Sequence, residues 1–172
     1  MGASSWKYRI PYQPDVILAL RQLREGVFER GEFDTTGGLA QMLATITRLK
    51  PDAAPELEKK IGPLIAQKML LRDSQSIEEL LERCAESGTH SILDIDSITD
   101  APTVGSMSPV SDEALLELFG TTKPTGQMFE SDGQSASGFY QTGLYGLWQA
   151  VYVVLYRNDM PDEIYIEGVS GD

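Results

Sequence analysis

The sequence feature that most constrains the fold is an uncharged run near the end of the chain. Residues 151–156 are valine, tyrosine and leucine, which is the composition of a buried strand. Turn residues follow from Asn158 to Pro161, and acidic and apolar side chains then alternate from Asp162 to Glu167. This order predicts an antiparallel β-hairpin, with Asp162, Glu163 and Glu167 pointing outward from its second strand.

Two other segments have the pattern of strands. Between Trp6 and Tyr12, aromatic residues and isoleucine alternate with Lys7 and Arg9, and Pro11 favours either an edge strand or the end of a strand. We expect this strand to pair with the hairpin and to bring the two ends of the chain together. A second short strand is predicted from Ser91 to Ile95, because Gly88 precedes an apolar run that is too short for a helix.

Helices are predicted where apolar residues recur three and four positions apart. The expected helices cover residues 14–31, 36–50, 55–69, 76–87 and 111–120, with one more turn within 124–130. Ser76 and Glu79 match a capping box at the start of the fourth helix. Gly62 and Pro63 predict either a bend in the third helix or a division into two short helices.

These elements predict a single globular domain over residues 1–172. Its class is α+β, with an N-terminal helical part packed on a small antiparallel sheet that includes the C-terminal hairpin. Residues 6–12 or 91–95 supply the flanking strands. Residues 99–109 are expected to form a loop and residues 131–138 a flexible loop, whereas residues 121–147 contain stretches that fit either helix or strand.

Charge is distributed unevenly along the chain. The net charge is -12, but residues 1–72 carry +3, which leaves -15 for residues 73–172. Such a field repels nucleic acid and anionic membranes and attracts a basic partner, although high charge also serves solubility alone. We therefore expect no binding to nucleic acid or membrane, and a partner-binding surface made of acidic residues. The candidate partner-binding residues are Glu78, Glu82, Asp94, Asp96, Glu113 and Glu117.

The residues that carry most catalytic and metal chemistry are few. Asp94, Asp96 and Asp100 offer oxygen atoms to a hard cation, but the spacing of a calcium loop is absent, and a solvent-exposed position is the favoured alternative. His90 is the single histidine, and Cys84, Ser87 or Ser91 would have to serve as its nucleophile. No local motif supports such a pair, so we expect no catalytic residue, metal or cofactor.

Cys84 is the single cysteine and cannot form an intramolecular disulfide. The start of the chain has no signal-peptide pattern, and the longest apolar stretch, residues 143–156, is too short to span a bilayer. These features predict a cytoplasmic protein.

Three segments, Tyr8–Asp15, Gly88–Ile95 and Asp162–Asp172, resemble parts of small uncharacterised bacterial proteins of similar length. The acidic single-domain chain is also similar in class to toxin-neutralising immunity proteins. This resemblance implies a non-enzymatic protein that binds and inhibits a cognate toxin with a basic surface or active site. Two alternatives stay open: a small metal- or ligand-binding enzyme domain that uses Asp94, Asp96 and His90, and a structural subunit that self-associates through residues 39–49.

Overall fold

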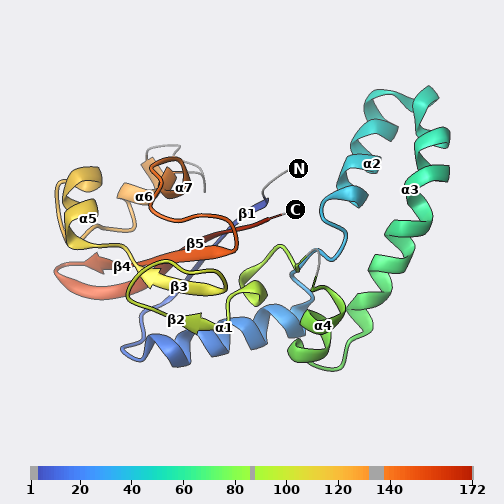
Figure 1. Ribbon diagram of the computed structural model, residues 1–172. Coiled ribbons are helices and arrows are strands. Elements are labelled where there is room, and N and C mark those ends of the chain that lie inside the picture. Colours follow the sequence, from blue (N-terminus) through green and yellow to red (C-terminus); the bar gives the residue numbers. More distant parts are fainter. Residues whose placement is uncertain (1–3, 86–87, 132–137, 172) are drawn as a thin grey trace.

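A computed structural model describes residues 4–85, 88–131 and 138–171 of the chain, and these residues form an α+β fold around a five-stranded sheet. The strands lie in the order β1 (Ser4–Pro11), β5 (Met160–Ser170), β4 (Gln149–Arg157), β3 (Ser106–Pro109) and β2 (Ser97–Ile98). The predicted hairpin, β4 and β5, therefore occupies the centre of the sheet (Figure 1). The β1/β5 and β5/β4 pairs are antiparallel, but β4/β3 and β3/β2 are parallel, so the sheet is mixed rather than wholly antiparallel.

The hairpin turn is shorter than the sequence predicts. Arg157 pairs with Met160, so only Asn158 and Asp159 lie between the strands. Both have positive φ angles, 52° and 62°, as the central residues of a type I′ turn do. This turn matches the right-handed twist of the two strands, and Pro161 already belongs to β5.

The first strand lies at the edge of the sheet and ends at Pro11, so both positions that the sequence allows for this proline are found. It pairs with β5 along its whole length, from Ser4 opposite Ser170 to Pro11 opposite Glu163. The two ends of the described chain consequently lie side by side (Figure 1). Lys7 and Arg9 are exposed on this edge, which discourages pairing with a further strand.

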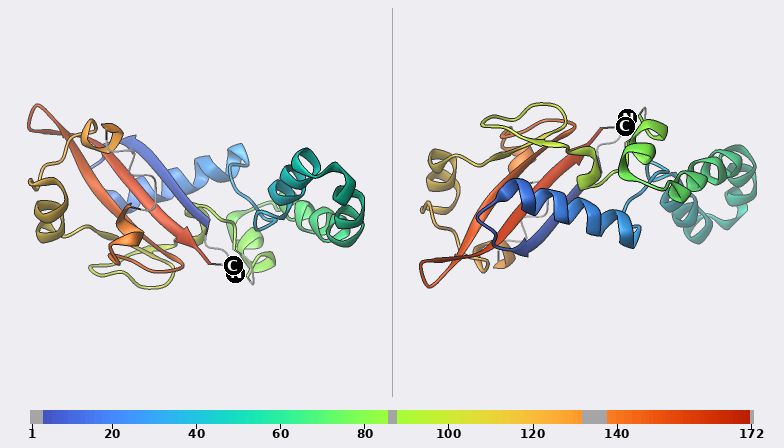
Figure 2. Two further views of the ribbon diagram at one scale, coloured as in Figure 1. Left: turned by 90° about the horizontal axis from the view of Figure 1, so that it is seen from above. Right: turned by 90° about the horizontal axis from the view of Figure 1, so that it is seen from below.

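Helices cover both faces of the sheet (Figures 1 and 2). On one face lie α1 (Val16–Arg30), which ends at the left-handed Gly31, and the nearby α4 (Ile77–Arg83), which begins with Ser76 as its cap. On the other face lie α5 (Asp112–Phe119), α6 (Met128–Ser131) and α7 (Gly138–Gln141). Each face has its own cluster of buried apolar side chains, because every strand residue points to one face or the other.

The remaining helices form an arm that projects away from the sheet (Figures 1 and 2). The arm consists of α2 (Leu39–Leu49), the short 3-10 turn η1 (Pro51–Ala53) and α3 (Ala54–Met69). The α3 helix is one continuous element that includes Gly62 and Pro63. A second 3-10 turn, η2 (Leu70–Asp73), leads back to the body.

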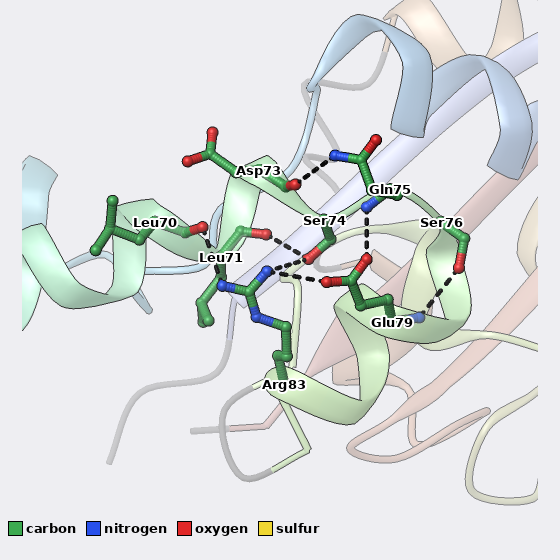
Figure 3. A network of polar contacts seen from close by, with 8 residues as sticks. All are labelled: Leu70, Leu71, Asp73, Ser74, Gln75, Ser76, Glu79 and Arg83. Atoms are coloured by element: carbon green, nitrogen blue, oxygen red, sulfur yellow. Dashed lines mark hydrogen bonds and ion pairs between the residues drawn. The ribbon is translucent and has the colours of Figure 1, made fainter.

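Polar contacts hold the base of the arm to the body (Figure 3). The guanidinium of Arg83, on α4, donates to Ser74 Oγ at 3.0 Å, to the Leu70 carbonyl at 3.2 Å and to Glu79 at 3.4 Å. On the other side, Thr35 Oγ1 donates to the Lys68 carbonyl at 2.8 Å. The arm is therefore fixed to the body at its base.

The strand predicted from Ser91 to Ile95 is wrong. These residues form a 3-10 turn, η3 (Ile92–Asp94), in which Ser91 Oγ accepts from the Leu93 backbone N–H at 3.2 Å. Ile92, Leu93 and Ile95 are all fully buried. These three residues therefore lack the alternation of buried and exposed positions that identifies a half-buried strand. The flanking strand is instead β3, within residues predicted as a loop, where serine-rich backbone pairs with β4.

Candidate functional site

The six candidate partner-binding residues do not share one surface. Glu78 and Glu82 lie on α4, Asp96 follows η3, and Glu113 and Glu117 lie on α5. The α4 and α5 helices lie far apart, near opposite ends of the sheet, in every view (Figures 1 and 2). The sixth residue, Asp94, is directed into the protein.

The acidic group near α4 contains its own counter-charge. Arg24, on α1, donates to the Leu93 carbonyl at 3.3 Å and is half-buried. Burial lowers the pKa of Arg24, while Asp96, Glu78 and Asp94 oppose that shift through their negative charge. Hydrogen bonds to its own backbone N–H and to Ser76 lower the pKa of Glu78, and Arg24 contributes in the same direction. Part of this acidic charge is therefore neutralised within the molecule.

The acidic group on α5 has no such compensation. Ser111 Oγ caps the helix by accepting from the Ala114 N–H at 3.2 Å, and Ala114 and Leu115 bury the inner side. The outer side exposes Glu113 and Glu117 together with Leu116, which is 52% exposed. Asp112, Glu113 and Glu117 take part in no ion pair with any described residue. This outer side of α5, which we call the α5 face, is acidic with an apolar centre.

Asp94 has a structural role. Its Oδ1 accepts from the Thr89 backbone N–H at 2.7 Å and from Thr89 Oγ1 at 2.9 Å. Its Oδ2 accepts from Ser170 Oγ at 2.6 Å, and Ser170 Oγ in turn accepts from Trp6 Nε1 at 3.1 Å. Asp94 thus joins the segment before β2 to the end of β5 and to β1, and both oxygen atoms of its carboxylate accept hydrogen bonds within the protein.

Next to this network the backbone is strained. Trp148 has a φ of 60° and His90 a φ of 50°, values that side chains of this size rarely adopt. A Cβ atom at Gly88 or at Gly171 would collide with the Trp148 ring. The sequence shows these glycines, but nothing in it indicates that Trp148 is the neighbour that requires them.

The residues considered for metal or nucleophilic chemistry are dispersed, buried or hydrogen-bonded, or lie outside the described ranges. No cluster of three or more histidine, cysteine, aspartate or glutamate side chains in the described ranges is arranged to hold a metal ion. Cys84 is 2% exposed, and burial, with a smaller effect of Asp94, raises the pKa of its thiol. Ser91 Oγ is hydrogen-bonded to Thr89 Oγ1 at 2.9 Å, and Ser87 lies outside the described residues.

A buried carboxylate is present where the sequence predicts an exposed one. Glu167, on β5, is 2% exposed, so the expectation that it points outward is wrong. It accepts hydrogen bonds from Tyr145 Oη at 2.9 Å and Tyr165 Oη at 2.8 Å, and also from the backbone of Tyr140 and Phe139. Burial raises the pKa of Glu167, although these hydrogen bonds oppose the shift. The residues from Ile164 to Ser170 are all buried because both faces of β5 are covered here. An alternating sequence pattern therefore does not separate buried from exposed side chains in this strand.

Comparison of the chain with protein-family models, curated protein sequences and solved structures finds no match. Among the described residues, no helix is long and apolar enough to cross a membrane. The loop expected at residues 131–138 falls almost entirely outside the described residues.

Proposed function

We propose that this protein is a non-enzymatic acidic binding protein, in its most concrete form a bacterial immunity protein that inhibits a toxin with a basic surface or active site. The observation that carries the proposal is the α5 face, where acidic side chains surround an exposed leucine and no described base pairs with them. The similarity in class to immunity proteins supports the same interpretation.

The chemistry of the α5 face suits a basic protein partner. Unpaired carboxylates at the rim of a contact accelerate association with a positively charged surface. Leu116 would lie at the centre of the contact, where exclusion of water stabilises the complex. The group near α4 is less suitable because Arg24 is among its charges.

Binding of the protein encoded by the adjacent gene tests this proposal. We predict that Glu113→Gln with Glu117→Gln weakens the complex by about tenfold or more, because two charges facing the partner are lost. The matched control is Glu78→Gln with Glu82→Gln on α4, which removes the same charge and should change the dissociation constant by less than about threefold. Isothermal titration calorimetry at low and high salt provides the measurement.

Raising the salt concentration should weaken the complex, because exposed charges are screened. Absence of a complex, or a complex insensitive to salt, contradicts the proposal. An equal loss of affinity in the two double variants would contradict the assignment to the α5 face.

A further inference from the structure

The arm contains a helix with too little packing for its composition. No residue of α2 is buried, although five of its eleven residues are leucine, isoleucine or methionine. The stretch from Leu39 to Thr47 carries no charge. Short helices in water are stabilised mainly by packing of an apolar side, and within the arm α2 packs on α3 and on the connecting turn η1 alone.

The exposed apolar residues of α2 lie on one flank of the helix. Its packed stripe consists of the half-buried Leu39, Leu43 and Ile46. At about 100° per residue, Met42 and Leu49 fall to the same side of this stripe. They are 41% and 67% exposed, respectively.

The exposed apolar flank of α3 faces the same side of the arm as the exposed apolar flank of α2. Its packed stripe contains Ile61 and the buried Ile65, and Leu57 and the 43% exposed Leu64 lie to one side of it. Leu57 and Leu64 lie in the same rotational direction from the packed stripe of α3 as Met42 and Leu49 do from the packed stripe of α2. Because the two helices run antiparallel (Figure 1), both flanks face the same side of the arm. A groove of about 320 Å³, lined in part by Leu49 and Leu57, connects the two flanks.

We propose that this surface of the arm, made of Met42, Ile46, Leu49, Leu57 and Leu64 and called here the arm face, binds the same face of a second copy to form a two-fold four-helix bundle. Residues 39–69 carry five Lys and Arg against three Asp and Glu, a net charge of +2. The rest of the chain therefore carries a net charge of -14, which together with the +2 of the arm gives the total of -12. Contact through the projecting arms keeps the two acidic bodies apart (Figures 1 and 2).

The size of the arm face suits a weak dimer. The 16-residue α3 is about 24 Å long and two helices side by side are about 20 Å wide, which gives a footprint of roughly 400–500 Å² per copy. Two footprints bury roughly 800–1,000 Å² together, at or just below the limit of about 1,000 Å² for specific association, which is the range of a weak contact. Among the described residues, the other large exposed apolar side chains are spread over separate elements, for example Ile17 on α1, Leu116 and Leu118 on α5, Val104 and Met160, and each of these groups is smaller than the arm face. A two-fold contact also closes on itself and does not lead to filaments.

Sedimentation velocity of the full chain, from low-micromolar to near-millimolar concentration, tests this proposal independently of the proposed function. We predict a reversible dimer that high salt does not weaken, since the contact is apolar. Leu49→Lys with Leu64→Lys should raise the dissociation constant by at least about tenfold. The matched control is Ile17→Lys, which alters a 72% exposed residue outside the arm. This substitution should leave the dissociation constant of the dimer unchanged.

Hydrogen exchange of the unmodified protein is a second measurement that does not depend on the folding of a variant. Amide protection within residues 39–65 should increase with protein concentration, while protection in α1 should not. A mass of one chain at every concentration overturns the proposal. So does a dimer that survives the double variant, or one that Ile17→Lys disrupts equally.

Discussion

Glu167 places a carboxylate where its charge is poorly solvated, between β5 and the segment that contains Tyr145. Its pKa is raised above the ordinary value of 4.5, mainly by burial. The folded protein therefore binds this proton more tightly than the unfolded chain does. The resulting stabilisation is complete below about pH 4.5 and is lost as the pH rises through the raised pKa.

We predict that Glu167→Gln reduces this pH dependence. Relative to the native protein, the free energy of unfolding of the variant should rise as the pH increases above about 4.5, because glutamine has no proton to lose. Urea unfolding at a series of pH values measures the difference. Parallel stability curves for the two proteins would contradict the assignment to Glu167.

Tyr145→Phe tests the hydrogen bond itself. Loss of the donor should lower the free energy of unfolding near neutral pH by about 1–2 kcal/mol. It should also raise the pKa of Glu167 further, because the Tyr145 hydrogen bond opposes the effect of burial. Tyr140→Phe is the control: Tyr140 lies in the same aromatic cluster, but no side-chain hydrogen bond joins it to Glu167.

At the level of single elements, the hairpin turn depends on the backbone of Asp159. Asp159 has a φ of 62°, and its carboxylate is in an exposed ion pair with Lys123 at 3.6 Å. We predict that Asp159→Gly is more stable than Asp159→Ala by about 1 kcal/mol, because alanine is strained in this conformation. Both variants lose the ion pair, so their difference in thermal unfolding isolates the backbone. Equal stability would indicate that the turn relaxes.

The elements that the sequence predicts correctly have one exposed side, a capping residue or, in β4, an uncharged run of β-branched and aromatic residues. Alternation reveals β1, and the caps Ser76 and Ser111 mark the starts of α4 and α5. The sequence does not reveal β3, because its serines suggest a loop until β4 is present to pair with them. Burial on all sides likewise hides the turn at Ile92–Asp94 and the inward position of Glu167, since periodicity requires solvent on one side. The sequence shows that the candidate residues are acidic, but their separation into two distant groups, near α4 and on α5, depends on tertiary structure (Figure 1).

At the level of the whole molecule, the arm and the body have separate interiors. Neither cluster of buried apolar side chains includes a residue of α2 or α3, and the arm buries only Ala54 and Ile65. Few buried contacts give a low free energy of local opening. The arm is therefore expected to open before the body, and a second copy bound to the arm face would delay that opening.

The positions of the two tryptophans make this difference observable. Trp6 and Trp148 both lie near Ser170 and Gly171 in the body, and the arm contains no tryptophan. Intrinsic fluorescence therefore reports on the body alone, whereas circular dichroism near 222 nm also detects the helices of the arm. During urea unfolding at low protein concentration, the dichroism signal should begin to decrease before the fluorescence changes, and coincident transitions would show that the arm and the body unfold as one unit.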